Sequence, residues 1–198
     1  VSDIFAIRAY RRDFEWQVLK ISFIGMTLGV LIGGLTAHIV LDWVVTLMIG
    51  LMGFVFSIKQ IFQRVDFSKI NKDINTKSGL FWCTVAGFTS FISHNGGPPW
   101  QIFTLPLGLR KSVFVGTSVL AFSYCNLIKV IPYFMLNQIT LTTLLTSLYL
   151  MIPATIAVFV GVRIIKIIPE KVFFKIVTWS LLIISLKLIY DGLKFKNF

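Results

Sequence analysis

A short run of residues with unusual backbone chemistry interrupts an apolar stretch near the middle of the chain. It reads Ser93-His94-Asn95-Gly96-Gly97-Pro98-Pro99. Glycine is conformationally permissive and proline lacks an N–H donor, so the run is not expected to remain helical. A helix broken in apolar surroundings exposes unpaired N–H groups, and a second helix starting near Trp100 would aim its positive dipole end at the break. With the neutral donors of Ser93 and Asn95, the run predicts an anion site. The alternative is that Gly-Gly-Pro-Pro only turns a structural hairpin.

His94 within this run and three further residues are candidates for ligand binding. His94 could carry a proton or pair with an anion when charged, or be a neutral residue that bonds a carbonyl in the turn. Lys129 lies inside another apolar stretch, where a cation is costly unless it faces a cavity or a partner, although it could also snorkel to the outer interface. Asn126 lies three residues earlier, so amide and charge could face one ligand. Thr117, on the same stretch, is more typical of a packing hydroxyl than of a ligand.

The composition indicates that these residues lie in a membrane protein. Of the 198 residues, 56% are hydrophobic and 14% are charged, whereas soluble domains carry roughly 25% charged residues. The net charge of +11 would suit nucleic acid, but Lys and Arg fall mostly between the apolar blocks, as the positive-inside rule requires. We therefore expect a lipid bilayer as partner and no nucleic acid. Cys83 and Cys125 lack CxxC spacing, so no disulfide or metal site is expected.

The apolar blocks predict an all-α fold with about five full transmembrane helices. Each helix needs about 20 residues to cross a bilayer. The predicted spans are residues 18–37, 43–61, 112–136, 141–162 and 172–193.

A sixth block, residues 78–109, is predicted to form a re-entrant hairpin. Its arms, 79–93 and 100–109, are each too short for a hydrocarbon core of roughly 30 Å. A hairpin places fifteen of the 19 cations on the cytoplasmic side, whereas a single crossing would place many of them outside, against the positive-inside rule. The fifteen are Arg8, Arg11, Arg12, Lys20, Lys59, Arg64, Lys69, Lys72, Lys77, Arg110, Lys111, Arg163, Lys166, Lys171 and Lys175.

A weak internal repeat predicts two inverted halves. Residues 57–62 (Ser-Ile-Lys-Gln-Ile-Phe) match residues 185–190 (Ser-Leu-Lys-Leu-Ile-Tyr), each at the end of the last span of its half. The second half is a hairpin followed by three spans, and an odd number of crossings inverts a similar first half. We therefore expect residues 1–77 to be the remainder of a first repeat, with two spans and a cytoplasmic loop. Residues 78–198 form the second repeat. On this plan the chain lacks the first hairpin and most of the following span.

Two motifs resemble the second half of the sulfite exporter TauE/SafE family. One covers residues 86–99 and ends in Gly-Gly-Pro-Pro, and the other covers residues 116–133, from Gly116-Thr117 to Asn126-x-x-Lys129-x-x-Pro132-Tyr133. Residues 10–16 are similar to the loop before the family's third span. The resemblance implies a multi-pass transporter of the bacterial cytoplasmic (inner) membrane.

We therefore expect a secondary transporter that exports a small sulfur-containing anion, such as sulfite, thiosulfate or an organosulfonate, by alternating access, with a proton as the candidate coupling ion. A rival hypothesis is a non-transport assembly or scaffold factor of the same fold. Uptake of a cation such as nickel is disfavoured, because no cluster of Asp, Glu, His or Cys faces the break. Neither enzymatic activity nor a cofactor is expected, since Ser90, Ser93 and His94 lie too close in one arm for a triad and no Walker motif is present.

Overall fold

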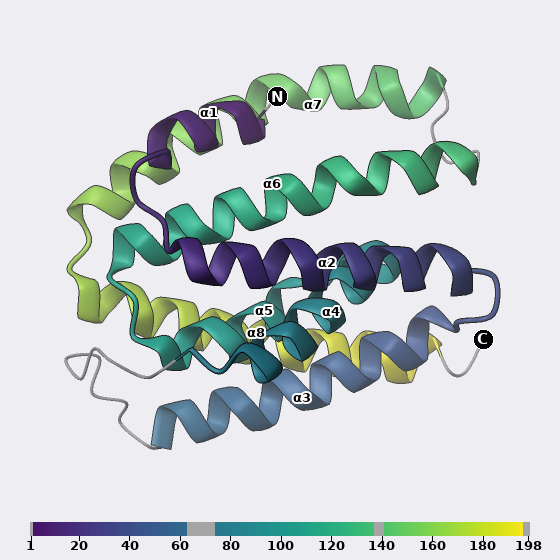
Figure 1. Cartoon of the computed structure of the whole chain (residues 1–198), viewed down its shortest axis with the longest axis horizontal. Coiled ribbons are helices and arrows are strands. Elements are labelled where there is room, and N and C mark those ends of the chain that lie inside the picture. The colour runs from purple at the N-terminus through teal and green to yellow at the C-terminus, as the bar shows by residue number, and fades with distance from the viewer. Residues whose placement is uncertain (1, 63–73, 137–140, 196–198) are drawn as a thin grey trace.

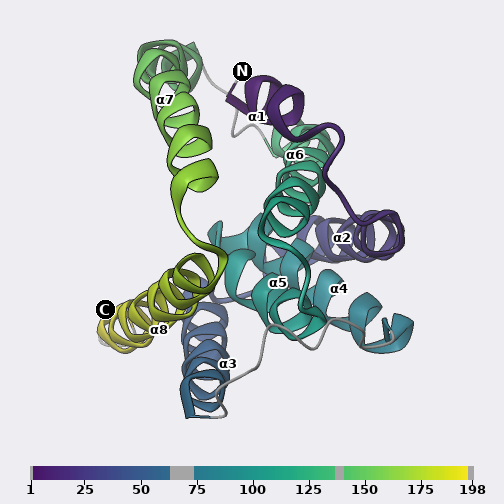
Figure 2. The same ribbon diagram turned by 90° about the vertical axis from the view of Figure 1, so that its left-hand side faces the viewer.

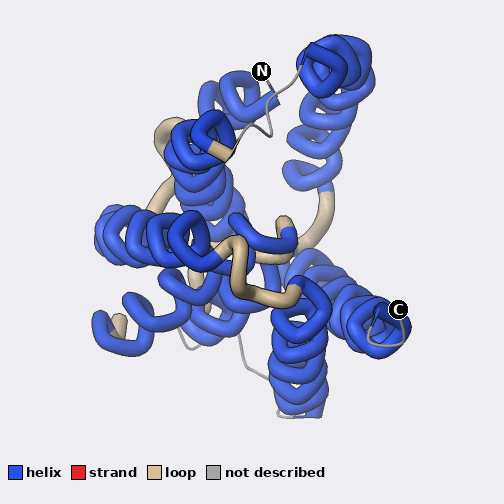
Figure 3. The backbone as a smooth tube through the Cα atoms, turned by 90° about the vertical axis from the view of Figure 1, so that its right-hand side faces the viewer, coloured by secondary structure: helices blue, strands red, loops and turns tan. Residues whose placement is uncertain are grey.

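The described part of the chain consists of helices joined by short loops, without strands (Figure 3). The computed structural model describes residues 2–62, 74–136 and 141–195. Its elements are α1 (Ser2–Tyr10), α2 (Trp16–Thr36), α3 (Asp42–Phe62), α4 (Thr76–Ser93), α5 (Gly97–Thr104), the 3-10 turn η1 (Leu105–Leu107), α6 (Lys111–Met135), α7 (Leu141–Ile167) and α8 (Glu170–Phe195).

Five of these helices, α2, α3, α6, α7 and α8, are long and apolar enough to cross a membrane. They have 21 to 27 residues, which at about 1.5 Å per residue matches a hydrocarbon core of roughly 30 Å. The all-α, polytopic fold with five spans is thus confirmed. The division into two inverted repeats stays a prediction.

The α4–α5 segment forms the expected hairpin. A Cβ atom on Gly79, in the first turn of α4, would overlap the ring of Phe103 near the end of α5. At the other end, a Cβ atom on Gly96 would overlap the carbonyl oxygen of Ala86. The second arm therefore runs back alongside the first, and Figure 2 shows α5 in the centre of the molecule.

The break in this hairpin is shorter than the sequence predicted. The non-helical residues are His94 to Gly96, and α5 already begins at Gly97. Pro98 and Pro99 therefore lie in the first helical turn, although both had been expected outside the helix. The physical reason is that N–H groups in the first turn have no intrahelical partner, so a proline there sacrifices no hydrogen bond.

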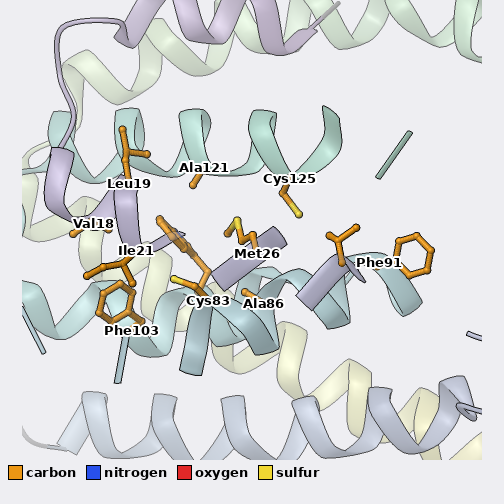
Figure 4. Packing of buried hydrophobic residues seen from close by; sticks show 12 residues of the cluster. Val18, Leu19, Ile21, Met26, Cys83, Ala86, Phe91, Phe103, Ala121 and Cys125 are labelled. Atoms are coloured by element: carbon orange, nitrogen blue, oxygen red, sulfur yellow. The ribbon is translucent and has the colours of Figure 1, made fainter. Parts of the chain in front are cut away.

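The packed centre lies between α2, α4, α5 and α6 (Figure 4). Buried side chains from these four helices point toward one another there, among them Met26, Cys83, Phe103 and Cys125. Helices α2 and α4 approach very closely, because a Cβ atom on Gly29 would overlap the carbonyl oxygen of Thr84. Small residues at such contacts are typical of helix pairs in membranes, where close van der Waals packing drives association.

Two other pairs of helices complete the arrangement. Helix α3 packs along α8, and α7 packs against α1. The most apolar window of α7 is 0% buried, so its exposed side chains are suited to contact lipid.

The segments that carry the predicted cytoplasmic cations meet at one end of the molecule. In Figure 1, α2, α6 and α8 begin on the left, where α3 and α7 end. Hydrogen bonds join these segments: Lys111 Nζ donates to the Ile168 carbonyl (2.6 Å) and Lys111 N donates to Glu170 Oε1 (3.2 Å). Three of the fifteen cations, Arg64, Lys69 and Lys72, lie outside the described residues.

Candidate functional site

A buried lysine reaches the end of α4 beside the helix break. Lys129, on α6, is 5% exposed. Its Nζ donates to the hydroxyl of Ser90 (3.0 Å) and to the carbonyl oxygen of the same residue (3.3 Å). Ser90 lies one turn before His94, where α4 stops. The Lys129 side chain therefore points into the protein, contrary to the alternative of a lysine that snorkels to the interface.

Among the described residues the Lys129 ammonium makes no ion pair, although the Asp3 carboxylate on α1 acts on it electrostatically from a longer distance. The ion pair found there joins Lys187 to Asp191 at the exposed end of α8. The direct compensating interaction comes from α4, whose last carbonyls have no intrahelical donors and carry the negative end of the helix dipole. Because that end is equivalent to roughly half an elementary charge, it offsets only part of the ammonium charge. The remaining positive potential can attract an anion.

Tyr133 caps the same end of α4. It lies one turn after Lys129, its hydroxyl donates to the Phe91 carbonyl (3.0 Å), and its ring stacks on that of Phe91 (4.9 Å between centroids). The His94 ring meets Tyr133 edge-on at 6.1 Å. Lys129 and Tyr133 thus satisfy two successive orphan carbonyls of α4 and fix the position of the break.

The break itself is held by hydrogen bonds to the last turn of α4. The N–H groups of His94 and Asn95 both donate to the Thr89 carbonyl, and the Thr89 hydroxyl donates to the Asn95 carbonyl (3.2 Å). His94 adopts the left-handed conformation, with φ of 56°, a conformation that glycine adopts more readily than other residues. The exposed His94 side chain therefore stands at the tip of the hairpin.

The first turn of α5 offers fewer N–H donors than the sequence suggested. Pro98 and Pro99 have none. The N–H groups of Gly96 and Gly97 remain, and the described residues provide neither with a partner. A Cβ atom on Gly97 would meet nothing within 4 Å, whereas one on Gly96 would meet the Ser90 side chain. Gly97 therefore faces open space, and Gly96 is pressed against the residue that binds Lys129.

Three other predicted residues have partners of their own. The Ser93 hydroxyl donates to the Thr89 carbonyl within α4 (3.2 Å). The Asn126 amide donates to Asp3 Oδ2 on α1 (3.3 Å), so Asn126 and Lys129 face different neighbours. Thr117 is buried and accepts a hydrogen bond from the Glu15 backbone (2.9 Å). It anchors the corner before α2, in keeping with a packing hydroxyl.

Sequence reasoning missed Ser90 and Tyr133 as site residues. Helical spacing could have indicated both, because Ser90 lies one turn from His94 and Tyr133 one turn from Lys129. The other polar contact near the break is a hydrogen bond from Trp100 Nε1 to the Ser118 hydroxyl (2.9 Å), which fixes α5 against α6.

The donor set suits an anion better than a metal ion. The groups at the break are an ammonium, hydroxyls, an imidazole and N–H donors, whereas hard cations require oxygen ligands, mostly carboxylates and carbonyls. In residues 2–62, 74–136 and 141–195, no three His, Cys, Asp or Glu residues cluster as metal ligands.

Comparison with known families agrees with this chemistry. A family model described as sulfite exporter TauE/SafE matches residues 1–188. The chain belongs to the sulfite exporter TauE/SafE family. The TauE/SafE family is a family of anion transporters, and with five candidate spans this member is a multi-pass membrane protein. Searches among curated proteins and among solved structures found no match.

Proposed function

We propose that this TauE/SafE protein exports a small sulfur-containing anion (sulfite, thiosulfate or an organosulfonate) across the bacterial cytoplasmic membrane by alternating access. The observation that carries the proposal is the buried Lys129, which lies beside a broken helix and makes no direct ion pair among the described residues. Such a cation is costly in an apolar environment, and an anionic ligand would compensate it.

The oxygen atoms of the cargo would bind to a cation and to hydrogen-bond donors around the break. The Lys129 ammonium would supply the charge, and the Ser90 hydroxyl, which accepts from that ammonium and also lies at the Cys125 thiol, could turn its own proton toward the cargo. The N–H groups of Gly96 and Gly97 add neutral donors at the positive end of the α5 dipole. His94 stands at the tip, where protonation would add a second charge, and this makes it the candidate for proton coupling.

The position of α5 supports alternating access around this site. On one side, Gly96 contacts Ala86 and Ser90 of α4 and Phe122 of α6. On the other side, Pro98 lies against Gly53 of α3, which in turn contacts Ser185 of α8. The break thus lies between two groups of helices, α2–α4–α6 and α3–α8. Rocking of one group against the other would expose it to each side of the membrane in turn.

The test is anion-dependent thermal stability of the purified protein. Sulfite, thiosulfate and an organosulfonate should raise the unfolding midpoint relative to chloride, by an amount equivalent to about 2.7 kcal/mol at a ligand concentration of one hundred times Kd. Lys129→Met keeps the side-chain length and removes the charge, so it should fold and lose the shift. Lys187→Met, which removes an exposed lysine, is the matched control and should keep it.

The rival hypothesis of an assembly or scaffold factor makes the opposite prediction. For such a protein none of the sulfur anions would shift the midpoint more than chloride does. An equal shift in Lys129→Met and in the unsubstituted protein would move the site away from Lys129.

A further inference from the structure

In the part of the chain that the structure describes, most of the buried polar atoms without partners lie on α3, α5 and α8. Within the described residues four buried side-chain atoms lack a hydrogen-bond partner, and three of them lie on these helices: Ser185 Oγ, Gln101 Oε1 and Gln60 Nε2. Ser185 is 0% exposed and Gln60 is 8% exposed. Neither lipid nor apolar side chains can satisfy such groups, so each one needs water or a ligand.

Gly53 of α3 lies in contact with both α5 and α8. A Cβ atom there would overlap the Ser185 hydroxyl and touch the Pro98 ring at 3.4 Å. Because Gly50 contacts Ile189 and Gly192 contacts Leu47, helices α3 and α8 run antiparallel past this point. Ser185 therefore lies beside the first turn of α5, across the break from Lys129.

The two glutamines lie between this contact and the end of the molecule that carries the predicted cytoplasmic cations. Gln101 lies three residues after Pro98, on the same face of α5. Gln60 lies two turns after Gly53, about 10 Å further along the same buried face of α3. Either end of an amide can face a solute, so these residues can both donate and accept hydrogen bonds.

We propose that Ser185, Gln101 and Gln60 line a second, uncharged polar subsite between α3, α5 and α8, which takes the oxygen atoms of the cargo and its hydration water. The identity of the cargo rests on the proposed function above. Lys129 supplies the charge on one side of the break, and this subsite supplies neutral hydrogen bonds on the other. An anion that leaves the ammonium thereby keeps polar partners instead of meeting apolar side chains.

Cysteine labelling tests whether water reaches this subsite, whatever the cargo is. N-ethylmaleimide crosses lipid but reacts with the thiolate, which forms only where water or a polar group supports the charge. In the full chain in membranes, Ser185→Cys should react at least about tenfold faster than Leu188→Cys. Leu188 is the matched control, because it is buried on the same face of α8 among apolar side chains, and the unsubstituted chain gives the background of Cys83 and Cys125.

A transport measurement in proteoliposomes tests whether the subsite serves the cargo. Ser185→Ala and Gln101→Leu should each raise the KM for sulfite about tenfold, the change expected when one hydrogen bond to an anion is lost. Neither should lower the thermal midpoint, because Ser185 Oγ and Gln101 Oε1 have no hydrogen-bond partner in the described structure. Thr178→Val is the control, since that buried hydroxyl already bonds the Phe174 carbonyl of its own helix. Its KM should not change.

Two results would overturn the subsite. One is labelling of Ser185→Cys no faster than Leu188→Cys. The other is a loss of thermal stability in Ser185→Ala and Gln101→Leu as large as the loss of transport, which would assign a structural role. If the unsubstituted protein transports no sulfur anion, the proposed cargo is wrong, and the labelling ratio alone decides whether the polar subsite exists.

Discussion

Lys129 makes a structural hydrogen bond and is also the residue that we propose to bind the anion. Its ammonium caps the carbonyl of Ser90 at the C-terminal end of α4, which is a structural hydrogen bond. The same ammonium also bonds the Ser90 hydroxyl, which stands beside Gly96 at the break. The cap holds the charge in place, so the anion binding that we propose would require little reorganisation of the site.

The hydroxyls of Ser90 and Ser93 give a residue-level prediction. Ser90→Ala removes a group that positions Lys129 and can donate to the cargo, so affinity for sulfite should fall about tenfold, the usual size for a hydrogen bond to a charged group. Ser93→Ala should change affinity little, because this hydroxyl bonds the Thr89 carbonyl of its own helix. The anion-dependent shift of the unfolding midpoint measures both, and equal losses in the two variants would contradict the assignment.

At the residue scale the sequence predicted the charged group better than its partner. Lys129 could be found from the sequence because a cation inside an apolar span is rare and costly. Ser90 is one of several serines in apolar stretches, and its pairing depends on how α6 crosses the end of α4. No local pattern encodes that crossing.

At the scale of elements, the beginning of α5 separates two glycines that look alike in the sequence. Gly96→Ala should lower stability by about 1–3 kcal/mol, because the added methyl overlaps the Ala86 carbonyl and the Ser90 side chain. Gly97→Ala, in open space at the first helical position, should be neutral or raise stability by up to about 1 kcal/mol. Thermal unfolding in detergent measures the difference. Equal destabilisation by both would mean that the tip packs differently.

The lengths of the elements were predictable, and the exact limits of the break were not. The five spans follow from the thickness of the bilayer, which sets a minimum apolar length. The break was predicted too long because the cost of a proline depends on its place in a helix, and in the first turn that cost vanishes. The same shift places two prolines, which have no N–H, in the first turn of α5, so the predicted anion site has fewer N–H donors than expected.

For the whole molecule, the hairpin predicts that both of its ends face the cytoplasm. Lys77→Cys and Arg110→Cys replace exposed residues before and after it. Neither should react in intact cells with a membrane-impermeant thiol reagent, and both should react after permeabilisation. His38→Cys, in the loop between α2 and α3, should react from outside and serves as the control. Outside reaction of one hairpin end only would contradict the re-entrant topology.

The pairing of the helices is the part of the fold that the sequence did not provide. Spans that are apolar on every side have no stripe that indicates which face is buried. The informative signal is the distribution of small residues, since Gly29 and Gly87 lie where α2 meets α4, and Gly50 and Gly53 where α3 meets α8. A glycine in a span indicates that another helix approaches closely there. It does not indicate which helix this is, so the pairing could not be predicted from the glycines alone.

The single ammonium of Lys129 also has an electrical consequence for the proposed transport. The Lys129 ammonium alone matches a monoanion such as an organosulfonate, and protonated His94 would add the second charge that a dianion such as thiosulfate requires. A monoanion that leaves the cytoplasm of a cell with a negative interior moves down the electrical gradient, by about 2.3 kcal/mol per 100 mV. If the protein exports such an anion, as we propose, the membrane voltage itself would drive the transport, and uptake of the same ion would have to work against it.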